Sequence, residues 1–141
     1  MAKILVVDDE KDVVTLIKFI LEKDGHKVLE TYNGAQALEI IGVDPHKPDQ
    51  DIPDLIILDV MMPIMDGYTT VTRLREYPET RAIPILVLTA KGQMREIFEL
   101  APNVAAYIEK PFDPKNLRDL ISGMLTGGGS KTHEKSGPAG T

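Results

Sequence analysis

Five short runs of apolar residues alternate along the chain with segments in which apolar residues recur at helical spacing. A short apolar run bounded by turn signals is typical of a strand buried on both faces, as at the centre of a parallel sheet. We therefore predict strands over residues 3–7, 27–31, 55–58, 85–88 and 104–108, and helices over about residues 13–23, 35–41, 67–76, 93–100 and 114–125. This alternation predicts an α/β fold, a doubly wound parallel sheet with helices on both faces.

The spacing of apolar residues also predicts which side chains of each helix face the core. We expect inward positions at Val13, Leu16, Ile17, Ile20 and Leu21 in the first helix, at Tyr68, Val71 and Leu74 in the third, and at Leu117, Leu120, Ile121, Met124 and Leu125 in the last. Residues 42–53 have no such spacing and form a loop that is longer than most connections. Pro78 and Pro84 bracket a second expected loop.

Length and composition indicate one globular domain followed by a tail. The chain has 141 residues, and we assign residues 1–125 to the domain and the Gly/Ser-rich residues 126–141 to a flexible tail. The apolar runs are far shorter than the ~20 residues of a membrane helix, and no signal peptide is recognisable. The net charge of −6 argues against direct contact with nucleic acid. We expect a cytoplasmic protein without a membrane segment.

Polar side chains follow several predicted strands at the point where each strand ends. These residues are Asp8, Asp9, Asp59, Thr89 and Lys110. Singly, each has a simpler interpretation, such as a helix-capping acid, a strand-end hydroxyl or a surface charge. Because the carboxyl ends of parallel strands meet at one edge of the sheet, where α/β proteins bind their ligands, we expect all five side chains to lie together.

The expected cluster has the composition of a phosphoryl-transfer site. Three carboxylates at close range need a counter-charge, and Mg²⁺ prefers oxygen ligands of this kind. Lys110 supplies a second, fixed positive charge. A carboxylate surrounded by a metal ion, an ammonium and a hydroxyl is suited to carry a phosphoryl group, since aspartyl phosphates are established intermediates and their formation depends mainly on positioning and charge neutralisation.

The chain resembles the response-regulator receiver domains of two-component signalling. The resemblance rests on Val6-Val7-Asp8-Asp9, on Asp59 with Pro63, Asp66 and Gly67, on Thr89-Ala90, and on Lys110-Pro111-Phe112. It covers residues 3–125 and implies a flavodoxin-like (βα)5 fold, with five parallel strands in the order 2-1-3-4-5.

The same resemblance implies a role for each site residue. Asp59 would accept the phosphoryl group, and Thr89 and Lys110 would hold its oxygens. Asp9, Asp59 and the Met61 carbonyl would bind Mg²⁺ directly, with Asp8 assisting through water. Tyr107 and Thr89 would form the switch that responds to phosphorylation. We also expect the Lys110–Pro111 peptide bond to be cis, because a cis X-Pro bond in a tight loop can aim the preceding side chain inward.

A receiver of this kind implies protein partners and no turnover of a separate substrate. The expected partners are a sensor histidine kinase or a phosphotransfer protein, and a downstream effector. With 141 residues the chain has little room for an output domain, which favours a stand-alone receiver, with an excised fragment of a longer regulator as the alternative. We expect a monomer or a weak dimer that depends on phosphorylation, with self-phosphorylation and self-dephosphorylation as its own chemistry.

Two other classes of protein share parts of this pattern. A haloacid-dehalogenase-like phosphatase also uses an aspartate and Mg²⁺, but it needs a second aspartate two residues after the first, where this chain has Met61. A flavodoxin-like flavin-binding module needs a Ser/Thr/Gly-rich loop after the first strand. Here that loop is Asp8-Asp9-Glu10, whose charge would repel a flavin phosphate.

Overall fold

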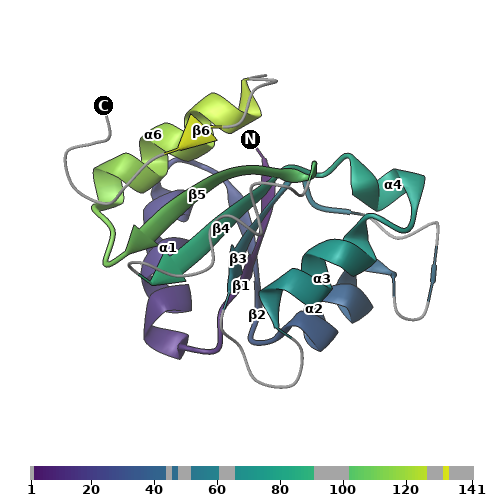
Figure 1. Ribbon diagram of the computed structural model, residues 1–141. Coiled ribbons are helices and arrows are strands. Elements are labelled where there is room, and N and C mark those ends of the chain that lie inside the picture. Colours follow the sequence, from purple (N-terminus) through teal and green to yellow (C-terminus); the bar gives the residue numbers. More distant parts are fainter. Residues whose placement is uncertain are drawn as a thin grey trace.

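The computed structural model describes residues 2–43, 46–47, 52–60, 66–90, 102–126 and 132–133. Strands and helices alternate along these segments (Figure 1). They are β1 (Lys3–Val7), α1 (Lys11–Lys23), β2 (Lys27–Thr31), α2 (Gly34–Ile41), β3 (Leu55–Asp59), α3 (Gly67–Leu74), α4 (Pro78–Arg81), β4 (Ile85–Ala90), β5 (Val104–Lys110), α6 (Pro114–Leu125) and β6 (Thr132–His133). No helix in these segments is long and apolar enough to cross a membrane.

The strands form one parallel sheet in the order β2-β1-β3-β4-β5-β6. Its first five strands confirm the predicted order 2-1-3-4-5. The sixth strand was not expected from the sequence. It has two residues, Thr132 and His133, which pair with Ala106 and Tyr107 at the outer edge of β5. The flexibility of the surrounding tail stays a prediction.

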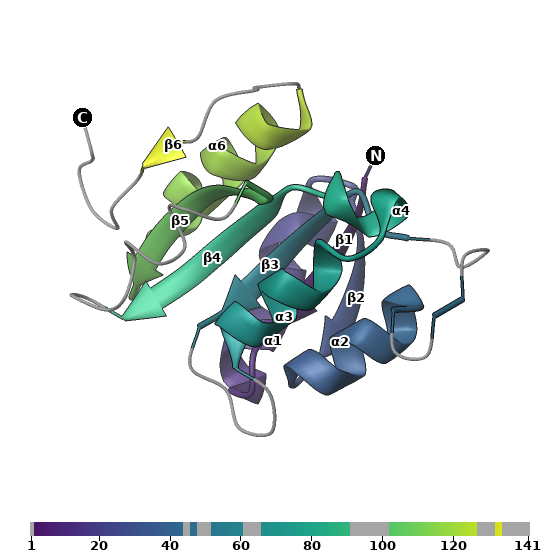
Figure 2. The same cartoon turned by 45° about the vertical axis from the view of Figure 1, so that its right-hand side comes forward.

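Helices cover both faces of the sheet and bury the strands between two apolar layers (Figure 2). Side chains of α2 and α3 pack on one face, and those of α1 and α6 pack on the other. All five residues of β3, the third strand of the sheet order, are buried. This explains why the strand reads as an unbroken apolar run, since neither of its faces meets water.

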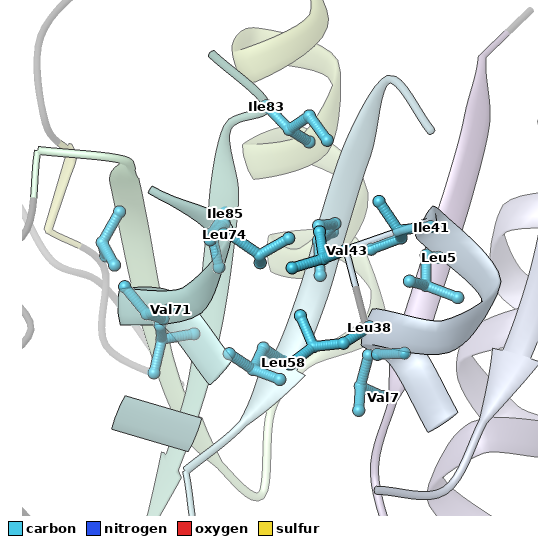
Figure 3. Packing of buried hydrophobic residues seen from close by; sticks show 14 of the residues in the cluster. Leu5, Val7, Leu38, Ile41, Val43, Leu58, Val71, Leu74, Ile83 and Ile85 are labelled. Carbon is cyan, nitrogen blue, oxygen red and sulfur yellow. The ribbon is translucent and has the colours of Figure 1, made fainter. Parts of the chain in front are cut away.

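In the layer beneath α2 and α3, the apolar side chains that recur at helical spacing pack against the sheet. Leu38 and Ile41 point from α2, and Val71 and Leu74 from α3, towards the side chains of the sheet (Figure 3). Val43, just after α2, is also buried in this layer and anchors the beginning of the long loop. The long loop therefore begins at a residue that is packed in the core.

The structure corrects several expected details. The Pro-bracketed segment contains the short helix α4, which begins with Pro78 and is fixed by the Thr80 hydroxyl donating to the Leu74 carbonyl at 2.6 Å. Leu16 and Tyr68, expected to face inward, are 44% and 47% exposed. Their helices are rotated slightly from the predicted faces, so that Val14 takes an inward position in α1. The helix expected over residues 93–100 lies outside the described residues.

The start of α3 is pressed against the end of the central strand. The Asp66 side chain caps this helix by accepting from the Thr69 amide at 2.7 Å, and the Gly67 amide donates to the Val60 carbonyl at 3.0 Å. A Cβ atom on Gly67 would lie 2.8 Å from the Asp59 carbonyl oxygen and 2.9 Å from Val60 Cα. A glycine is therefore needed here because backbone meets backbone.

We predict that Gly67→Ala destabilises the protein by about 1–3 kcal/mol, the usual cost of overpacking a site that cannot relax. Gly123→Ala is the control, because a Cβ atom there meets nothing within 4 Å, and it should stabilise α6 by up to about 1 kcal/mol. Urea unfolding of both variants measures the difference. Equal effects of the two substitutions would contradict the close approach at Gly67.

Candidate functional site

The predicted site residues lie at the carboxyl ends of neighbouring strands. Asp8 directly follows β1, Asp59 is the last residue of β3, and Thr89 lies next to the end of β4. Lys110 ends β5 and pairs with Ala90 of β4. Both β4 and β5 are two residues longer than predicted, which carries Thr89 and Lys110 into the paired part of the sheet. The pairing register of the strands thus fixes where the backbone of each site residue lies.

Three carboxylates converge at this edge of the sheet. Ligand atoms of Asp8, Asp9 and Asp59 all lie within 4.8 Å of one another. Asp8 and Asp59 are buried, whereas Asp9 is exposed. Burial and then repulsion by Asp8 raise the pKa of Asp59 to about 6, and burial also raises the pKa of Asp8. The folded protein therefore pays a cost for holding these groups ionised together.

Lys110 places its ammonium among these carboxylates. Its Nζ lies 2.9 Å from Asp8 Oδ2, 3.1 Å from Glu10 Oε1 and 3.4 Å from Asp59 Oδ1. Burial acts to lower the pKa of Lys110, but the contacts with Asp8 and Asp59 outweigh it and the pKa is raised. Lys110 is therefore charged at any physiological pH.

The Thr89 hydroxyl and the peptide bond after Lys110 complete the candidate site at this edge of the sheet. Thr89 is buried, and its Oγ1 has no hydrogen-bond partner among the described residues. A buried hydroxyl without a partner is costly, which indicates that another group can satisfy it. The Lys110–Pro111 peptide bond is cis, and the prediction from the sequence is confirmed.

Two other predicted residues have different outcomes. Tyr107 is buried in β5, within the apolar layer that α2 and α3 cover. This position fits a core residue, and its role as a switch stays a prediction. Met61, expected to offer a carbonyl ligand, lies outside the described residues.

Glu10 is the contact that sequence reasoning missed. From the sequence, Glu10 counted only as one charge of the Asp8-Asp9-Glu10 loop, whereas its side chain accepts a hydrogen bond from Lys110 across 100 positions of sequence. One signal was available. Glutamate is not among the residue types that favour the position before a helix, so its presence there calls for another contact.

The residues present fit a divalent cation. Among the described residues, Asp8, Asp9 and Asp59 form the group whose ligand atoms are close enough to share one ion. All their donors are carboxylate oxygens, the ligands that Mg²⁺ prefers. Burial raises the pKa values of Asp8 and Asp59 even with Lys110 in place, so a further cation would stabilise their charged forms.

The fold and this edge of the sheet define an α/β domain with a carboxylate cluster at the carboxyl ends of its strands, and comparison with known proteins identifies its family. The family model of the response regulator receiver domain matches residues 4–122. The chain therefore belongs to the receiver domain family of two-component signalling. This membership sets aside the phosphatase and flavin-binding alternatives.

Individual relatives support the assignment. The alkaline phosphatase synthesis transcriptional regulatory protein PhoP of Bacillus subtilis is 37% identical over 87% of this chain and 48% of its own length. The chain thus spans about half the length of such curated relatives. A putative response regulator from Chloroflexus aurantiacus has a TM-score of 0.77 at 32% identity, covering 89% of this chain and 98% of that one.

A third relative has a metal ion in its structure. The receiver domain of sensor histidine kinase PA1611 from Pseudomonas aeruginosa has a TM-score of 0.77 at 26% identity, covering 89% of this chain and 98% of its own. That structure has a magnesium ion coordinated in its active site cleft.

The raised pKa of Asp59 predicts a pH-dependent gain in stability when its charge is removed. Because the folded state binds this proton more tightly than the unfolded state, stability falls as pH rises from the ordinary value of 3.8 through about 6. In Mg²⁺-free buffer at pH 7.5, Asp59→Asn should raise the free energy of unfolding by about 1–3 kcal/mol. The gain should shrink as the pH falls towards 4.

Urea unfolding across this pH range measures the effect. Asp119→Asn, which removes a carboxylate that is 67% exposed on α6, is the control and should change stability little at any pH. A gain in Asp59→Asn that does not vary with pH would contradict the raised pKa.

Proposed function

We propose that Asp59 is the phosphoacceptor of this receiver domain. A carboxylate oxygen of Asp59 attacks the phosphorus of a phosphohistidine on a sensor histidine kinase or a phosphotransfer protein. The new P–O bond forms as the P–N bond breaks, and the leaving imidazole takes up a proton. The observation that carries the proposal is the Lys110 ammonium, which lies 3.4 Å from Asp59 Oδ1 among three clustered carboxylates.

The other residues of the site support this reaction by charge and position. Lys110 and the Thr89 hydroxyl, which has no hydrogen-bond partner among the residues that the structure describes, would hold phosphoryl oxygens. Asp8, Asp9 and Asp59, with the Met61 carbonyl, would hold Mg²⁺, which supplies charge neutralisation during transfer. Self-phosphorylation from small phosphodonors and self-dephosphorylation follow from the same arrangement.

The output of the domain is a change of protein contacts. Thr89 and Tyr107 lie in the neighbouring strands β4 and β5, where Tyr107 pairs with Val87, two residues before Thr89. Under this proposal, movement of Thr89 towards a phosphoryl oxygen would alter the packing of Tyr107. A downstream effector in the cytoplasm would read this change, with the chain as a monomer or as a weak phosphorylation-dependent dimer. The net charge of −6 favours a protein over nucleic acid as the direct partner.

Asp59→Ala should abolish hydroxylamine-labile labelling by acetyl phosphate, because it removes the attacking oxygen. Asp119→Ala, at an exposed position on α6, should label like the wild type. Intact-mass measurement reports the added phosphoryl group, and circular dichroism confirms that both variants fold. Labelling that persists in Asp59→Ala would assign the acceptor to another residue.

Asp9→Ala should weaken Mg²⁺ binding at least about tenfold, because it removes one carboxylate of a small oxygen site. Asp12→Ala is the control, since Asp12 is a nearby exposed carboxylate in the first turn of α1 that lies outside the cluster. Calorimetric titration with MgCl₂ measures both affinities. Equal losses in the two variants would mean that general charge, and not coordination, attracts the ion.

A further inference from the structure

The helix α1 begins without the side-chain cap that its neighbours have. Asn33, Asp66 and Asp113 cap α2, α3 and α6 by accepting from main-chain amides at 2.9, 2.7 and 3.0 Å. Glu10 occupies the same position before α1, in the same extended backbone conformation, but its side chain accepts no amide of the helix. Helix α1 therefore lacks the stabilisation that a side-chain N-cap would provide.

The Glu10 carboxylate contacts Lys110 instead. Its Oε1 accepts from Lys110 Nζ at 3.1 Å, while its backbone amide donates to Asp8 Oδ1 at 2.9 Å. The backbone of Glu10 is thus tied to the site, and its side chain is long enough to reach the ammonium. The Glu10 side chain therefore contacts the Lys110 ammonium in place of capping α1.

The three carboxylates around Lys110 differ in how easily they can give it up. An ammonium has three N–H donors, and a phosphoryl oxygen that binds Lys110 must displace one partner. The Glu10 side chain is 62% exposed, whereas those of Asp8 and Asp59 are 0% and 9% exposed. Water can replace Lys110 at Glu10 but not at Asp8, so Glu10 is the partner whose release costs least.

We propose that Glu10 is a positioning residue that holds the Lys110 ammonium at the mouth of the site and yields it to the phosphoryl group. This inference rests on the phosphoacceptor role proposed for Asp59. Glu10 thereby sets how tightly the site binds a phosphoryl group, because every binding event must first break the Glu10–Lys110 contact.

The substitution Glu10→Asp separates this contact from charge. Aspartate keeps the negative charge but is one methylene shorter, and at this position it favours the amides of α1, which turns its carboxylate away from Lys110. Asp12→Asn is the matched control. It removes a charge from the first turn of α1, where Asp12 is exposed, and leaves Glu10 in place.

The probe is beryllofluoride in the presence of Mg²⁺, a stable mimic of the phosphoryl group, titrated by NMR. Glu10→Asp should tighten beryllofluoride binding about 1.5- to 5-fold, the range expected for loss of one exposed ion pair. Asp12→Asn should bind like the wild type. Unchanged or weaker binding by Glu10→Asp, or equal tightening in Asp12→Asn, would overturn the role of Glu10.

A second measurement needs neither Mg²⁺ nor beryllofluoride. The ¹⁵N resonance of Lys110 Nζ should shift in Glu10→Asp and stay in place in Asp12→Asn, and an unmoved resonance in Glu10→Asp would contradict the contact. The two levels of inference fail differently. A wild-type protein that does not bind beryllofluoride contradicts the phosphoacceptor role, and the role of Glu10 with it. A wild type that binds, with Glu10→Asp no tighter, contradicts the role of Glu10 alone.

Discussion

Repulsion among carboxylates at the end of a buried sheet is the constraint on which this structure depends. Ligand atoms of Asp8, Asp9 and Asp59 lie within 4.8 Å of one another, and the parallel pairing of β1 with β3 holds the backbones of Asp8 and Asp59 side by side. Lys110 offsets part of this negative charge, and Glu10 adds to it. The negative charge that remains suits this edge to a divalent cation and, under the proposed function, to a phosphoryl group with its counter-ion.

The burial that stabilises the fold also creates the costs at its functional edge. Two apolar layers hold the strands, and the same low exposure raises the pKa of Asp59 to about 6 and leaves the Thr89 hydroxyl without a partner in the described structure. Gly67 adds a backbone contact against the end of β3 that no side chain tolerates. Unfavourable features gather where a ligand can relieve them, and the rest of the domain supplies the stability that supports them.

Much of the fold and the site could be predicted because both depend on strands buried on two faces. Such strands appear as apolar runs, and the first polar residue after each run lies at the shared edge, as Asp8 and Asp59 do. The sequence was less informative where a single contact decides the structure. Helix α4 depends on one hydroxyl of Thr80, and β6 is two polar residues within a tail that lacks an apolar pattern. The Glu10–Lys110 contact joins residues 100 positions apart, and the unusual glutamate before α1 does not by itself identify Lys110 as its partner.

The three carboxylates around Lys110 differ in solvent exposure, and this difference determines which of them releases the ammonium most easily. Asp8 is fully buried and cannot exchange its ion pair for water, so it is the carboxylate that holds the ammonium within the site. Asp59 makes the longest of the three contacts, which leaves its carboxylate oxygen the least committed to Lys110. Glu10 is open to solvent and can release the ammonium at little cost. Lys110 can thus keep its ion pair with Asp8 and leave the Asp59 carboxylate available for reaction. It can transfer its remaining N–H donor from Glu10 to an incoming oxygen without any movement of the strands that hold the site.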